Sequence, residues 1–101
     1  MLYSMYKNPR LINTKHMQKV TDKPNRGLIG EMVYCSKNTI GSDNYFRVDA
    51  GYVAEVIDVR HYNKSKYCIK VELRSEDISN YSGWVKPSDF ILFKDVRHIF
   101  I

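Results

Sequence analysis

The sequence predicts one small, mainly β domain of five to six antiparallel strands, preceded by a short helix or a flexible arm. Three observations support this prediction. The chain has 101 residues, which is the size of one ordinary domain. Hydrophobic residues make up 44% of it and charged residues 27%, as in globular rather than disordered proteins. From residue 28 onward, short runs rich in β-branched residues alternate with polar stretches rich in Gly, Asn and Ser.

Residues 1–27 are predicted to form an element of their own, followed by the β domain at 28–101. Apolar side chains recur at roughly helical spacing between Leu11 and Val20, and Pro9 suits the first position of a helix. A Pro-Asn-Arg-Gly stretch then ends the segment, because proline and glycine favour turns. We therefore predict one short helix here or, alternatively, an arm that becomes ordered on binding.

Two strands and a long loop are expected in the first half of the β domain. The largely apolar stretch 29–35 predicts a first strand. A polar loop follows at 36–49, and within it residues 45–48 are the candidate for a short strand. The β-branched run 51–60 predicts a full strand.

The second half predicts the partner strands. After a polar hairpin loop, residues 67–74 alternate as a half-buried antiparallel strand requires. The side chains expected on its apolar face are Tyr67, Ile69, Val71 and Leu73. Residues 83–85 begin another strand, which Pro87 must end or interrupt. The apolar stretches 91–93 and 96–101 close the chain, which predicts that the C-terminus is paired in a sheet.

The segment 83–91 resembles the end of an SH3 domain. Its sequence is Gly-Trp-Val-Lys-Pro-Ser-Asp-Phe-Ile, and that family ends with Gly, an aromatic, a β-branched residue, Pro, Ser, Asn, Tyr and Val. In the family, the Pro-Ser-Asn-Tyr stretch forms a 3₁₀ turn before the last strand. The order of a strand, a long polar loop and a central hairpin is also similar. The resemblance implies an SH3-like barrel over residues 28–101.

The chain departs from the SH3 pattern where that family binds proline-rich peptides. Lys86 is inserted before the proline, and Phe90 lacks the tyrosine hydroxyl. The only groove-like positions that carry over are Tyr34, Pro87 and Phe90. The resemblance therefore implies the barrel without its proline-rich ligand, and the wider superfamily includes barrels that bind nucleic acid or partner proteins. Trp84 is expected to anchor the core, as a lone tryptophan in a small domain usually does.

The positive charge is concentrated at the N-terminus. The net charge is +5, and residues 1–27 carry six Lys and Arg against one acid, whereas residues 28–101 carry ten of each. A basic arm on a neutral body is suited to phosphate backbones. A solvated N-terminus that binds nothing would have the same composition.

The predicted hairpin tip offers a second basic site. It places Lys64 and Lys66 between Tyr62 and Tyr67. Lysines contact phosphates, and tyrosine rings stack on unpaired bases. A polar turn between two strands would contain the same residue types, so both interpretations stay open.

Sequence motifs for catalysis and metal binding are absent. The chain has no Walker A loop, no Gly-x-Ser-x-Gly and no His-Glu-x-x-His. Cys35 and Cys68 lack the Cys-x-x-Cys spacing of zinc sites, so we expect no metal and no cofactor. Both thiols are expected to be small buried side chains in a reduced compartment.

One tetrapeptide occurs twice. Asp-Val-Arg-His lies at 58–61 and again at 95–98. Paired histidines with two arginines would suit a ribonuclease, with His61 and His98 as acid and base. Ion pairs between Asp and Arg on exposed strand faces, such as Asp58 with Arg60, are the simpler explanation.

These observations predict a non-enzymatic binding module with nucleic acid as the leading partner. The expected contact residues are Lys15, Lys19, Lys23, Arg26, Lys64 and Lys66. The alternative is a protein-interaction module or inhibitor, such as a phage accessory protein that acts on a host protein. Its expected contact residues are Tyr34, Tyr62 and Tyr67. The chain has no apolar run near the ~20 residues that cross a bilayer and no secretory signal, so we expect a cytoplasmic protein without a membrane partner.

Overall fold

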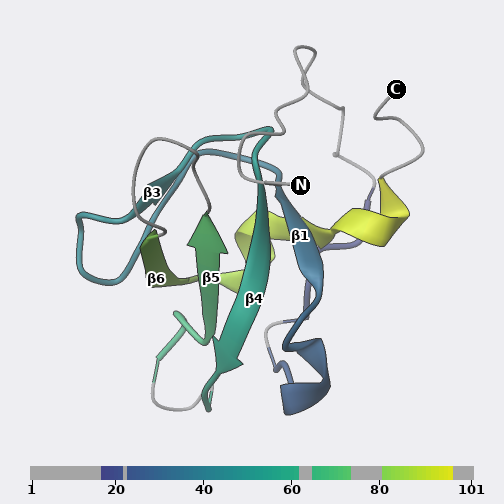
Figure 1. Ribbon diagram of the computed structural model, residues 1–101, viewed down its shortest axis with the longest axis horizontal. Helices are drawn as coiled ribbons and strands as arrows, with labels where there is room; N and C mark the ends of the chain where they lie inside the picture. The colour runs from purple at the N-terminus through teal and green to yellow at the C-terminus, as the bar shows by residue number, and fades with distance from the viewer. Residues whose placement is uncertain (1–16, 22, 62–64, 74–80, 97–101) are drawn as a thin grey trace.

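The computed structural model describes residues 17–21, 23–61, 65–73 and 81–96 (Figure 1). The described residues form a five-stranded antiparallel sheet in the order β6-β5-β4-β1-β7, and a two-stranded sheet pairs β2 with β3. The strands are β1 (Met32–Cys35), β2 (Thr39–Ile40), β3 (Arg47–Val48), β4 (Val53–Val59), β5 (Ile69–Leu73), β6 (Tyr81–Val85) and β7 (Phe90–Leu92). Single 3₁₀ turns form at η2 (Arg26–Leu28), η4 (Pro87–Asp89) and η5 (Phe93–Asp95).

The mainly β class predicted from the sequence is confirmed. Each pairing between described strands is antiparallel, and β4 and β5 form the central hairpin. The edge strands of the sheet are β6 and β7, which do not pair with each other among the described residues, so these pairings do not close a barrel. No helix among the described residues has the length and apolar character needed to cross a membrane.

The predicted alternation of β5 is confirmed. Ile69, Val71 and Leu73 are buried, whereas Lys70 and Glu72 between them are half-exposed. Because successive side chains of a strand point to opposite faces, one face of β5 joins the core and the other meets solvent. The prediction that both cysteines are small buried side chains is also confirmed, since Cys35 and Cys68 are free thiols with no exposed surface.

Strand β1 is covered on both faces, so the Tyr34 side chain is buried. Val33 and Cys35 belong to the main core, whereas Tyr34 packs in a second cluster with Val53, Ile91 and Val96. Tyr34 is only 1% exposed, and Phe90 and Pro87 are buried as well. The three groove-like positions carried over from the SH3 resemblance are therefore filled core in this chain and present no peptide groove.

The expectation that Trp84 anchors the core is wrong. Gly83 and Val85 are the buried residues of β6, so the strand period turns Trp84 to the opposite face, where it is half-exposed and pairs with Lys70. On the buried face, Phe46 fills the space over Gly83.

The N-terminal segment is not helical where the structure describes it. Residues 17–21 form no helix, and the Val20 amide donates to the Phe90 carbonyl at 2.8 Å. Val20 is 6% exposed and packs in the main core. The helix predicted around Leu11 otherwise lies outside the described residues. This hydrogen bond and the burial of Val20 attach the segment to the first residue of β7.

The first strand begins later than predicted. Residues 26–28 form η2, and Gly30 has a φ of 94°, a conformation that L side chains rarely adopt. The chain then re-enters the sheet, since the Gly30 amide donates to the Val56 carbonyl at 2.8 Å. These contacts hold η2 against β4 (Figure 1).

The prediction that Pro87 ends the strand is confirmed, and a 3₁₀ turn, η4, follows and ends in the buried carboxylate of Asp89. Thr39 Oγ1 donates to Asp89 Oδ2, and Lys37 Nζ lies 3.4 Å from Asp89 Oδ1. The Ser36 amide and hydroxyl both donate to the Asp89 carbonyl. These bonds tie the start of the loop that carries β2 and β3 to η4.

Candidate functional site

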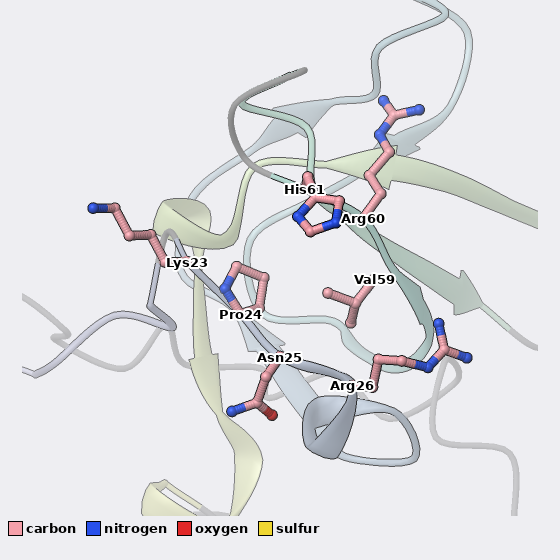
Figure 2. A pocket seen from close by; sticks show the side chains of 7 residues that line it. All are labelled: Lys23, Pro24, Asn25, Arg26, Val59, Arg60 and His61. Atoms are coloured by element: carbon pink, nitrogen blue, oxygen red, sulfur yellow. The ribbon is translucent and has the colours of Figure 1, made fainter.

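A pocket of about 530 Å³ lies between the N-terminal segment and the end of β4 (Figure 2). Its lining comes from Lys23, Pro24, Asn25, Arg26, Val59, Arg60 and His61. The volume is within the range of about 300–1,000 Å³ that is usual for small-ligand sites. Two segments far apart in the sequence therefore build one concave site.

Local hydrogen bonds fix the wall of the pocket that residues 23–26 form. Asn25 is the N-cap of η2, and its side-chain oxygen accepts a hydrogen bond from the Gly27 amide at 2.8 Å. This is the ordinary role of Asn at the start of a helical turn. It holds the amide group at the rim beside Pro24, and the preceding Lys23 amide donates to Thr21 Oγ1 at 3.2 Å.

The opposite wall is the end of β4. The register of β4 against β5 shifts between Val56 and Asp58, where a β-bulge adds a residue to β4. Beyond the bulge Val59 pairs with Ile69, and the Arg60 amide donates to the Cys68 carbonyl at 2.9 Å. Bulges re-aim the side chains that follow them. Here the bulge precedes Val59, which points into the pocket, and His61, whose ring lies at the rim (Figure 2).

The pocket has an apolar floor and a basic rim. Pro24 and Val59 face one another across the hollow, with the His61 ring above them and Asn25 below (Figure 2). The ammonium group of Lys23 and the guanidinium groups of Arg26 and Arg60 point outward (Figure 2). A ligand with a flat or apolar part and flanking negative charge matches this arrangement.

Asp58 forms its ion pair with Arg26. Arg26 Nη1 lies 3.8 Å from Asp58 Oδ1, and these two side chains are 79% and 47% exposed. A pair this exposed typically contributes less than about 1 kcal/mol, so its guanidinium remains open to an anionic ligand. The ion pair between Asp58 and Arg60 that the sequence suggested does not form in the described part of the chain.

Arg60 is held on the outer face of the sheet. Its Nε donates to the Tyr67 carbonyl at 2.8 Å, and its Cζ lies 4.2 Å from the centre of the Trp84 ring. The aromatic face attracts the cation, and the hydrogen bond orients it. Arg60 is therefore a fixed positive charge beside the pocket, and Trp84 serves as its platform.

The predicted nucleic-acid contacts separate into three groups. Lys23 and Arg26 line the pocket. Lys19 is half-buried and Lys66 is exposed, and neither lines it. Lys15 and Lys64 lie outside the described residues.

The three tyrosines predicted to contact a partner protein do not share one surface of the described structure. Tyr34 is a core residue, so its side chain is not available to contact a partner protein. Tyr67 is half-buried, and its carbonyl accepts from Arg60. Tyr62 lies outside the described residues.

Sequence reasoning missed Pro24, Asn25, Val59 and Arg60 as members of one site. The repeated Asp-Val-Arg-His tetrapeptide did mark three of the relevant positions, 59–61, but it suggested cleavage chemistry or an ion pair. His98 of the second copy lies outside the described residues. Nothing in the sequence indicates that residues 23–26 lie beside residues 59–61.

Groups suited to metal or nucleophilic chemistry do not gather here. Within the ranges that the structure describes, no three His, Cys, Asp or Glu side chains are placed to hold a metal ion. Burial raises the pKa of the Cys35 thiol from 9.0 to about 12, outweighing the hydrogen bond that it donates to the Lys37 carbonyl. Cys35 is therefore a protonated core thiol at neutral pH and not a nucleophile.

Comparisons with protein-family models, with curated proteins and with solved structures gave no match. The chemistry of the pocket therefore carries the functional proposal.

Proposed function

We propose that this protein is a non-enzymatic module that binds nucleic acid at the pocket between residues 23–26 and the end of β4. One observation carries the proposal. Lys23 and Arg26 of the basic segment lie around the same pocket as Arg60, which directly follows β4. Clustered basic side chains from separate segments provide the electrostatic footprint that a phosphate backbone needs.

The charge distribution supports the same partner. Residues 1–27 account for the whole excess of +5, and the described end of that segment forms one wall of the pocket. The Arg26 guanidinium exchanges Asp58 for a phosphate at small cost, because their exposed pair is weak. Arginine bound to phosphate also makes two parallel charge-assisted hydrogen bonds, which a lysine cannot.

We also propose that the β domain is SH3-like. Supporting observations are the 3₁₀ turn η4 before β7, the long polar loop after β1 and the central hairpin of β4 and β5. The wider superfamily includes barrels that bind nucleic acid, which is consistent with the proposed partner. The fold alone does not select a function.

The test compares two double variants that remove equal charge. Lys23→Gln with Arg26→Gln takes both cations from the pocket, whereas Arg47→Gln with Lys94→Gln removes two exposed cations that do not line it. Binding of a labelled oligonucleotide is measured by fluorescence anisotropy over a series of salt concentrations. Each lost phosphate contact lowers the slope of log affinity against log salt by about 1, so we expect the pocket variant to lose up to about 2.

The control variant is expected to keep nearly the whole slope and affinity. Equal losses in the two variants would mean diffuse attraction and would remove the pocket as the site. Affinity that does not fall with salt would contradict nucleic-acid binding by charge altogether.

A second candidate is a protein-interaction module, and one observation favours it. Tyr45, at the turn between β2 and β3, is 88% exposed, and Ile40 and Tyr81 are 43% and 44% exposed. Exposed aromatic side chains are frequent anchors of protein interfaces. If this candidate holds, a partner captured after nuclease treatment is lost with Tyr45→Ser and retained by the Lys23→Gln, Arg26→Gln variant.

A further inference from the structure

We infer that the pocket receives one unpaired base, so that the protein prefers single-stranded nucleic acid to a duplex. This inference rests on the proposed function and adds the class of nucleic acid. Basic residues alone hold phosphates of either class. The shape and the apolar floor of the pocket are what favour a single strand over a duplex.

The floor is suited to the flat face of a base. Val59 is 9% exposed, and Pro24 is half-buried opposite it. Burying this apolar surface under a ligand is favourable, and phosphate groups cannot provide that burial. The bases of a duplex are stacked inside the helix, and only their edges reach the grooves. An unstacked base is the part of a nucleic acid that can enter a hollow of about 530 Å³ and cover its apolar floor.

His61 supplies the ring on which a base stacks. It is exposed, and its ring stands at the edge of the hollow above Pro24 and Val59 (Figure 2). Histidine is one of the aromatic side chains that stack on splayed-out bases. Stacking is tolerant of sequence because every base has a π-face.

The flanking cations can hold the backbone on either side of the bound base. Lys23 directly precedes Pro24 in the chain and Arg26 follows Asn25, so both can contact the phosphates that flank the base. The Asn25 amide points away from the hollow, and its oxygen accepts from the Gly27 amide, so we assign it no role in binding the base (Figure 2).

The test uses the full chain and three labelled ligands at one salt concentration. They are an oligothymidylate, the duplex that it forms with oligodeoxyadenylate, and an abasic strand of the same length. Stacking of one base changes affinity by about ten-fold or more, so we expect the oligothymidylate to bind at least about ten-fold more tightly than the abasic strand. We expect the duplex to bind more weakly than the oligothymidylate as well.

Variants of His61 separate stacking from charge. His61→Ala is expected to remove most of the preference for the oligothymidylate over the abasic strand. His61→Tyr keeps an aromatic ring without the imidazole nitrogens and is expected to retain the preference. Thermal melting checks that both variants are folded, which is expected because His61 is exposed.

The outcomes distinguish the inference from the proposed function. Equal binding of the three ligands, or tightest binding of the duplex, would overturn the single-strand inference and leave the proposed function standing. A His61→Tyr variant that behaves as His61→Ala would overturn the stacking role. If no ligand binds, both the proposed function and this inference are wrong.

Discussion

Replacing Gly83 by alanine is expected to cost about 2–3 kcal/mol of unfolding free energy. Gly83 is a buried residue of β6 and pairs with Val71. An ideal Cβ at this position would lie 2.5 Å from Cγ, 2.6 Å from Cδ2 and 2.7 Å from Cβ of Phe46. Carbon atoms that are not bonded to each other do not come this close, so the strand or the Phe46 ring must move.

The magnitude follows from how little Phe46 can move. Its side chain is 5% exposed, and its ring meets Tyr81 edge-to-face with centroids 5.3 Å apart. Extra methyl groups in a packed core cost about 1–3 kcal/mol, and crowding on several sides places Gly83→Ala in the upper part of that range. For a domain of this size the melting temperature should fall by roughly 10–20 °C.

Urea denaturation followed by the fluorescence of Trp84 measures the effect. Ser82→Ala is the control on the same strand, because Ser82 is half-buried on the opposite face, and it should change stability by no more than about 0.5 kcal/mol. In a Phe46→Ala background the cost of Gly83→Ala should drop by about 1 kcal/mol, since alanine lacks the Cγ and Cδ2 atoms that the new methyl group would overlap. A cost of Gly83→Ala that equals that of Ser82→Ala would refute the packing of Phe46 over β6.

Two further predictions concern buried polar groups. Because burial raises the pKa of Cys35 from 9.0 to about 12, the unfolded chain releases this proton first as the pH rises, and stability is lost between those values. From about pH 8 to about pH 10 the wild type should lose about 1 kcal/mol more unfolding free energy than Cys35→Ser, and parallel losses would contradict the raised pKa. Thr39→Val removes the hydroxyl that donates to the buried Asp89 carboxylate and should cost about 2 kcal/mol in urea denaturation. Thr39→Ser keeps that donor and should cost less, so a valine variant as stable as the serine variant would show that the hydrogen bond contributes nothing.

Local patterns determined most of the secondary structure. The alternation in residues 67–74 predicts β5 because a strand with one solvent face must alternate, and Pro87 ends β6 because it has no amide proton to donate. The N-terminal helix was predicted from a short apolar period that the described residues do not follow. The contact that decides their conformation, Val20 with Phe90, joins residues far apart in the sequence.

The candidate site could be predicted only in part. The charge count identified Lys23 and Arg26, because an excess of basic residues in one segment is visible in the sequence. Their position beside Val59 and His61 was not visible, since it depends on η2 packing against β4 and on the bulge in that strand. The sequence also did not show which tyrosine side chains are exposed.

The sequence by itself determined that this protein is a mainly β domain with buried thiols and a basic N-terminal segment. Periodicity, turn residues and charge are properties of neighbouring residues, so they can be identified without knowledge of the fold. Only the tertiary structure decided that Tyr34 is buried, that Trp84 faces outward beneath Arg60, and that two distant segments share a pocket. These outcomes depend on which faces of each strand are covered, and non-local packing sets that coverage.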